Sequence, residues 1–111
     1  MEWNGYMYQL TFLPVAKQDM ADIVRYISHE LCNPAAAGNL ADEMIEAAER
    51  LCNFPYINAV HQVVKPLKHE YRKLLVKNYI MFYWVDEEDK LVTIARVMYA
   101  RRNYDTHLHS P

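Results

Sequence analysis

The hydrophobic pattern changes its period once along this chain, and that change constrains the fold more than any other feature. Between residues 14 and 51, apolar side chains recur every three or four positions, which is the spacing of an amphipathic helix. From residue 71 onward, the apolar side chains form β-branched and aromatic runs, which are typical of strands. The pattern therefore predicts a helical first half and a sheet-forming second half.

The helical half is predicted to contain two helices. Pro14 suits the first turn of a helix, where its missing N–H has no partner to lose. The first apolar stripe consists of Ala16, Met20, Ile23, Ile27 and Leu31. Asn33 and Pro34 then restart the pattern as a cap and a first helical residue. The second stripe consists of Ala37, Leu40, Met44, Ala47 or Ala48, and Leu51. Because almost no linker separates the helices, we expect an antiparallel hairpin.

The remaining apolar segments are predicted to form four strands. Three late runs occupy residues 71–76, 79–85 and 91–98. We expect these to form an antiparallel meander, with Asn78 taking the positive φ of the first tight turn. Residues 6–12 alternate with period two and predict one more strand. The last two runs are apolar on both faces, so neither should be an edge, and the first strand is placed beside the last. The predicted fold is α+β, with the helices on one face of the sheet.

The composition indicates a single domain. The chain has 111 residues, of which 52% are hydrophobic and 23% charged. We expect one domain over 1–111, with residues 1–6 as an N-terminal extension and 104–111 as a tail. The longest apolar stretch is residues 79–85, whereas a membrane helix needs about 18 residues. The opening residues lack a signal pattern, so the cytoplasm is the expected compartment.

The cysteines and histidines predict neither a disulfide nor a metal site. Cys32 and Cys52 should lie at opposite ends of the hairpin, roughly 25 Å apart at about 1.5 Å per residue. A disulfide needs Cα atoms within about 7 Å, so we expect both cysteines to be small packing residues. The five histidines have no partner at structural-zinc spacing. No cofactor is expected.

The two halves of the chain carry opposite charge. Residues 1–55 have 3 basic and 8 acidic side chains, whereas residues 56–111 have 9 basic and 6 acidic ones. The cations of the second half are interleaved with tyrosines, a combination that suits phosphate contact with base stacking. The same combination suits an acidic protein partner. It is equally typical of a protected edge strand with half-buried tyrosines. The acidic side chains of the helices are interpreted as a solvated face.

Four segments, in this order, resemble the RelE/ParE toxins of bacterial type II toxin–antitoxin systems, also called plasmid stabilisation systems. They are YQLTFLPVAKQDMADIVRYI, LCNFP, YRKLLVKNYIMFYWVD and VTIARVMYARRNYD. The resemblance covers residues 8–108 and is closer to the ParE branch. It implies a toxin that arrests growth and is held inactive by a cognate antitoxin, whose acidic segment wraps it. A homodimer and a toxin–antitoxin hetero-oligomer are both compatible with the resemblance.

The resemblance implies one of two activities. RelE-type members cut messenger RNA on the ribosome without a metal, using lysines and arginines around the phosphate, whereas ParE-type members poison DNA gyrase and lack that set. Arg72 falls where one phosphate-binding lysine lies, and Arg101 matches an arginine after the last strand. Leu74 and Ile80 replace two expected cations. His107 falls roughly where a terminal tyrosine acts.

These replacements favour the ParE branch, because a missing fixed charge weakens the stabilisation of a phosphoryl transition state. The first hypothesis is therefore a gyrase-directed toxin. The alternatives are a ribosome-dependent endoribonuclease and an inactive relative that only binds a partner. For a nuclease, the catalytic residues would be Arg101, Tyr104 and His107. The residues expected to bind the target or nucleic acid are Lys68, Arg72, Lys73, Lys77, Tyr99 and Arg102.

Overall fold

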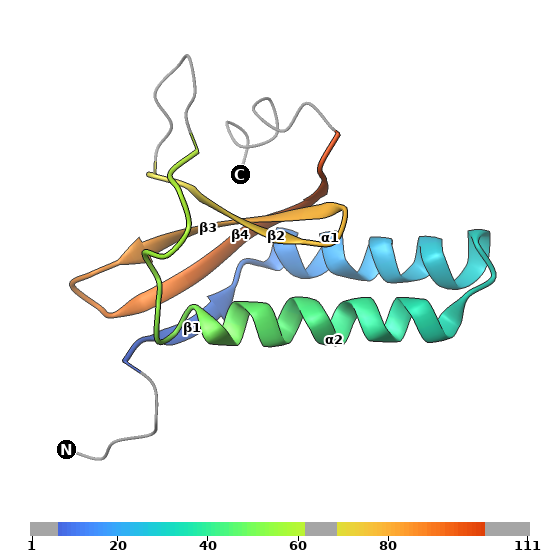
Figure 1. Ribbon diagram of the computed structural model, residues 1–111, viewed down its shortest axis with the longest axis horizontal. Coiled ribbons are helices and arrows are strands. Elements are labelled where there is room, and N and C mark those ends of the chain that lie inside the picture. The colour runs from blue at the N-terminus through green and yellow to red at the C-terminus, as the bar shows by residue number, and fades with distance from the viewer. Residues whose placement is uncertain (1–6, 62–68, 102–111) are drawn as a thin grey trace.

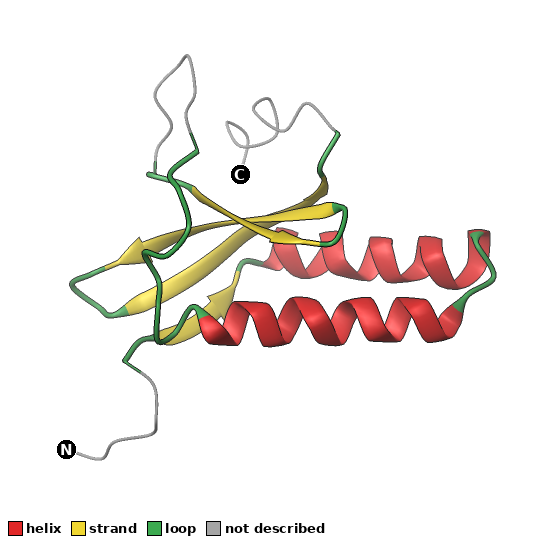
Figure 2. Ribbon diagram, viewed as in Figure 1, coloured by secondary structure: helices red, strands yellow, loops and turns green. Residues whose placement is uncertain are grey.

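The computed structural model describes residues 7–61 and 69–101, and it shows a helix hairpin packed on one face of a four-stranded sheet (Figure 1). The helical elements are α1 (Pro14–Arg25), the π-helix η1 (Tyr26–Glu30) and α2 (Pro34–Arg50). The strands are β1 (Gln9–Phe12), β2 (Arg72–Val76), β3 (Tyr79–Asp86) and β4 (Leu91–Tyr99). Figure 2 shows the two layers, and the expected α+β architecture is confirmed. The extension 1–6 and the tail 104–111 lie outside the described residues.

The sheet has the predicted strand order, β1-β4-β3-β2. The strands β2, β3 and β4 form the antiparallel meander. The strand β1 pairs with β4 in parallel, with Gln9 opposite Leu91 and Phe12 opposite Ile94. The two most apolar strands, β3 and β4, are thus central, and each is paired along both of its edges.

The helices start as predicted, but the first one ends differently. The side chain of Asn33 accepts a hydrogen bond from the Ala36 N–H at 3.1 Å, so Asn33 caps α2. After Arg25, the helix widens into η1, whose closing bond runs from the Leu31 N–H to the Tyr26 carbonyl. Leu31, the residue that follows η1, is 56% exposed. The prediction that Leu31 faces the core was therefore wrong.

The turn between β2 and β3 also differs from the prediction. The positive φ falls on Lys77, at 52°, and not on Asn78. The carbonyl of Asn78 accepts a hydrogen bond from the Ala100 N–H at 2.9 Å. This bond links the turn to the residue after β4. It thereby helps to fix the register between β3 and β4.

Two apolar clusters lie on opposite faces of the sheet, because neighbouring residues of β3 alternate between them. The helix-face cluster contains Met81 and Tyr83 and packs against α2 through Met44. The far-face cluster consists of Tyr71, Ile80, Phe82, Ala95 and Met98. A bulge in β4 inserts Ala95, since Tyr83 pairs with Ile94 and Phe82 with Arg96.

The two cysteines differ in their surroundings. Cys52 is buried at the end of α2, where it fits the predicted packing role. Cys32 is exposed between the helices with a φ of 52°, so it does not pack as expected. Both are free thiols. In the described part of the chain, no helix has the length and apolar character needed to cross a membrane.

Candidate functional site

A groove of about 1010 Å³ lies between the helix layer and the end of the sheet that carries the β2–β3 turn. We call it the helix–sheet groove. Its helical wall comes from α1, η1 and the first half of α2, and its other wall comes from the turn and the ends of β3 and β4. Its apolar lining consists of Ile23, Tyr26, Ile27, Leu31, Ala36, Leu40, Tyr79, Val97, Met98 and Tyr99.

Three tyrosines gather in the helix–sheet groove. Tyr79 and Tyr99 meet edge to face, with ring centroids 5.7 Å apart. Tyr26 and Tyr99 are 53% and 41% exposed. Burial, together with the phenols of Tyr99 and Tyr26, raises the pKa of Tyr79 above its ordinary value.

Charged side chains line the rim of the helix–sheet groove. Among the described lining residues, three are carboxylates, Asp19, Asp22 and Glu43, and one is a cation, Lys77. The Lys77 ammonium lies 3.3 Å from the Glu43 carboxylate, so this ion pair links the sheet to α2 across the groove. Asp22 pairs at 3.3 Å with Arg25 on the exposed side of α1. Such exposed pairs exchange readily with solvent and contribute little to stability.

Asp19 has a structural role at this end of the sheet. Its two carboxylate oxygens accept hydrogen bonds from Arg96 Nε at 2.8 Å and Nη2 at 3.0 Å. One of them also accepts the Val97 N–H at 2.9 Å. The strand β1 ends at Phe12 and the Leu13 N–H donates to the Ile94 carbonyl, so Asp19 accepts from β4 beyond the point where β1 pairs with it. The hydrogen bond to Asp19 raises the pKa of Arg96. The Arg96 cation is thus committed to holding α1 against β4.

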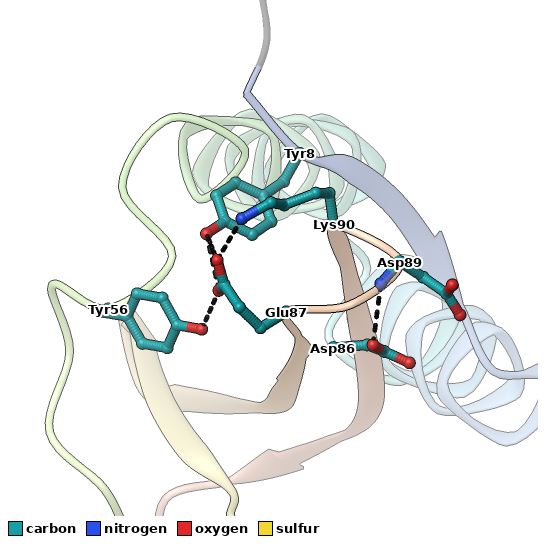
Figure 3. Close-up of polar contacts among 6 residues, drawn as sticks. All are labelled: Tyr8, Tyr56, Asp86, Glu87, Asp89 and Lys90. Atoms are coloured by element: carbon teal, nitrogen blue, oxygen red, sulfur yellow. Dashed lines mark hydrogen bonds and ion pairs between the residues drawn. The ribbon is translucent and has the colours of Figure 1, made fainter.

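A second polar arrangement lies at the other end of β3 (Figure 3). Glu87, in the β3–β4 turn, accepts hydrogen bonds from the hydroxyl of Tyr8 at 2.8 and 2.9 Å, from the hydroxyl of Tyr56, and from the Lys90 ammonium. We call these four residues the Glu87 cluster. It joins the start of the sheet, the loop after α2 and the β3–β4 turn.

Hydrogen bonding within the Glu87 cluster shifts the titration of its members. The bonds from Lys90, Tyr56 and Tyr8 lower the pKa of Glu87 to about 2. The bond to Glu87 raises the pKa of Tyr56 to about 12. At physiological pH, the cluster therefore holds one carboxylate, one ammonium and two neutral phenols. Every charge in it has a partner, so its chemistry fits a structural clamp.

Arg72 extends the Glu87 cluster toward β2. Its guanidinium lies 4.9 Å from the centre of the Tyr56 ring, and its Nη1 donates to the Asn58 carbonyl at 2.6 Å. A guanidinium held by a carbonyl and an aromatic face is already partnered. The cation that the resemblance assigned to phosphate binding thus secures the loop after α2.

The other predicted site residues do not gather into one patch. Lys73 is half-buried near the start of β2, at the same end of the sheet as Arg72. Lys77 and Tyr99 both line the helix–sheet groove at the opposite end of the sheet. Arg101 is exposed just beyond β4. The remaining predicted site residues lie outside the described part of the chain, namely Lys68, Arg102, Tyr104 and His107.

Sequence reasoning missed the acidic rim and the tyrosine at η1. Glu43 was interpreted as part of a solvated helix face, yet it follows Leu40 by three positions, which places it beside the apolar stripe. That spacing is a usable signal. Tyr26 follows Ile23 by three positions and so carries the same signal. In the residues that the structure describes, no three His, Cys, Asp or Glu side chains are placed to hold a metal ion.

Solved structures with a similar fold belong to toxin–antitoxin systems. A chain of the chromosomal ParDE system of P. aeruginosa matches with a TM-score of 0.69 and 18% identity, over 86% of this chain and 98% of that one. A chain of the RelBE2 toxin–antitoxin complex of Mycobacterium tuberculosis matches with a TM-score of 0.55 and 20% identity, over 88% and 97%. A mutant of the E. coli toxin RelE in the free state matches with a TM-score of 0.56 and 18% identity, over 93% and 94%.

These matches define the class as the RelE/ParE toxin fold. The family model of the ParE toxin of the type II toxin–antitoxin system, parDE, matches residues 10–104, and the chain belongs to this family. The comparison with curated proteins gives no match.

Proposed function

We propose that this toxin arrests growth by ParE-like inhibition of DNA gyrase and is neutralised by a cognate antitoxin. The observation that carries the proposal is the packing of Ile80. This residue occupies the place of a cation in the RNA-cutting branch, and here it is 5% exposed within the far-face cluster. A metal-free phosphoryl cleavage needs fixed positive charge beside the scissile phosphate. An aliphatic side chain buried among Phe82 and Met98 cannot supply it.

The surroundings of Ile80 support the same conclusion. Its partner on β2 is Leu75, which lies beside it on the far face. Leu74, the second substituted position, packs with the helix-face cluster, so the two positions do not share a face. Aromatic rings occupy the far face farther along β3, where His69 stacks on Trp84 with centroids 3.7 Å apart. The far-face cluster is apolar and aromatic where a nuclease would present cations, although Lys73, the cross-strand partner of Phe82, is a cation on the same face.

Expression of the chain without an antitoxin tests the target. We expect replication arrest, a DNA-damage response and altered plasmid supercoiling, while messenger RNA stays intact in primer extension. The purified toxin should also inhibit the supercoiling reaction of purified gyrase. Codon-positioned cuts that depend on translation would overturn the gyrase proposal in favour of a ribosome-dependent endoribonuclease. Normal growth with neither effect would favour an inactive relative.

A further inference from the structure

We infer that residues 54–57, in the loop after α2, form together with the acidic β3–β4 turn the surface through which this toxin binds gyrase. We call residues 54–57 the apolar turn. The inference rests on the proposed function and names the part of the toxin that meets the target. Phe54 and Ile57 would enter an apolar pocket of gyrase whose rim carries Lys or Arg side chains.

The apolar turn holds two large apolar side chains in solvent. The Ile57 N–H donates to the Phe54 carbonyl at 3.3 Å, and Pro55 occupies the second position, where its fixed φ suits a β-turn. Such a turn brings its first and last Cα atoms within about 7 Å of each other. Phe54 is 63% exposed and Ile57 is 72% exposed. Surface turns favour small and polar residues, so two neighbouring apolar side chains here indicate an interaction surface.

Hydrogen bonds fix the backbone of this loop beneath the exposed side chains. The Pro55 carbonyl accepts a hydrogen bond from the hydroxyl of the buried Tyr83 at 2.9 Å. The Asn58 carbonyl accepts one from Arg72 Nη1 at 2.6 Å. The loop is therefore anchored within the apolar turn and directly after it. A surface that is already ordered loses less conformational entropy when a partner binds.

The apolar turn lies beside a strongly acidic segment. The Tyr56 hydroxyl donates to the Glu87 carboxylate, and this bond sets the apolar turn against the β3–β4 turn (Figure 3). That segment has four successive acidic residues, namely Asp86, Glu87, Glu88 and Asp89. The Lys90 ammonium binds Glu87. Within the described ranges, no cation pairs with Glu88 or Asp89, and both are exposed.

The negative charge beside the apolar turn distinguishes between possible partners. The antitoxin segment implied by the family resemblance is acidic, so this surface would repel it. A two-fold contact between copies of this chain would bring two acidic turns together, which is also unfavourable. Gyrase acts on DNA, and proteins that hold DNA neutralise its phosphates with Lys and Arg side chains. Of these three partners, gyrase has the complementary charge.

The first test measures the affinity of purified toxin for purified gyrase and the inhibition of supercoiling. Phe54→Ser/Ile57→Ser should bind at least about tenfold more weakly than the wild type and inhibit correspondingly less. The control Ile45→Ser/Leu75→Ser removes two exposed apolar side chains from α2 and β2 and should bind within about twofold. Thermal melts should show both variants folded, because the replaced side chains are exposed. Equal gyrase affinity in the two variants would overturn the inference.

A second pair of variants tests the acidic turn without altering the apolar side chains. Glu88→Gln/Asp89→Asn should bind gyrase roughly fivefold more weakly at low salt, and the difference from the wild type should shrink as salt rises. The control Asp42→Asn/Glu46→Gln changes the net charge equally on the exposed face of α2 and should bind within about twofold. Equal weakening in both variants would show that net charge attracts gyrase, and would overturn the role of this turn.

Antitoxin binding separates the inference from the proposed function. Phe54→Ser/Ile57→Ser should bind the product of the adjacent gene as tightly as the wild type does. A variant that loses the antitoxin but still inhibits gyrase would assign the surface to the antitoxin. Loss of a wild-type dimer in sedimentation, with inhibition unchanged, would assign it to a second copy of this chain. Either result would overturn the inference and leave the proposed function standing. Wild-type toxin that does not inhibit gyrase would overturn both.

Discussion

Glu87 is a single exposed carboxylate on which three parts of the fold converge. Its pKa is about 2 in the folded protein, against an ordinary value of 4.5. Because the folded state holds the ionised form more strongly, the Glu87 cluster stabilises the fold above about pH 4.5, and this contribution is lost as the pH falls toward 2. Glu87→Gln should therefore reduce the loss of stability over that interval. Urea unfolding at a series of pH values measures this loss, and Glu88→Gln, at the neighbouring exposed residue, is the control. If the unfolding free energy changed equally with pH in the two variants, this account would be contradicted.

Ile80 and Leu75 offer a matched test of burial at one place in the sheet. They are cross-strand partners, but Ile80 is 5% exposed and Leu75 is 67% exposed. Ile80→Arg should lower the free energy of unfolding by at least about 3 kcal/mol, because it buries a charge among apolar side chains. Leu75→Arg should change it by about 0.5 kcal/mol or less. Urea denaturation decides between these outcomes. A stable Ile80→Arg variant would show that the far face can accommodate a cation after all.

At the scale of the elements, the docking of α1 on β4 depends on Asp19. Asp19→Ala would remove three hydrogen bonds and leave Arg96 half-buried without its partner. We expect a loss of about 2–4 kcal/mol in the free energy of unfolding. Asp22→Ala, which breaks an exposed pair on the same helix, should cost less than about 1 kcal/mol. Thermal and urea unfolding of the two variants compares them directly. Similar losses for both would mean that Asp19 does not hold the two elements together.

The elements themselves could be predicted from the sequence, because the hydrophobic period is a local property. The Asn33 cap and the strand order followed from neighbouring residues and from which strands were apolar on both faces. The widening at η1 could not be predicted, since Leu31 continues the helical spacing without interruption. The contacts of Asp19 with Arg96 and of Glu87 with Tyr8 could not be predicted from the sequence either. They join residues 77 and 79 positions apart, and a periodic pattern carries no information on such pairs. The groove was missed for the same reason, because its walls come from distant segments.

At the scale of the whole molecule, the two polar arrangements lie at opposite ends of β3, and Arg101 follows β4 at the groove end without belonging to the groove lining. It is exposed beyond the last strand, so replacing it should not disturb the fold. We expect Arg101→Ala to relieve growth arrest while the melting temperature stays the same. Growth after induction and a thermal melt of the purified variant measure the two effects. A lower melting temperature would make Arg101 a structural residue, and continued arrest with normal melting would place the site elsewhere.

The parallel pairing of β1 with β4 has a consequence for how each copy is made. Residues 9–12 leave the ribosome early, but their partners are residues 91–94, so most of the chain must be synthesised before this edge of the sheet can close. Val97 and Tyr99, which complete the groove, follow later still. Translation that stops before residue 91 therefore yields a chain in which β1 has no partner strand and the groove lacks the lining residues of β4. Incomplete copies of this toxin should be harmless to the cell that makes them.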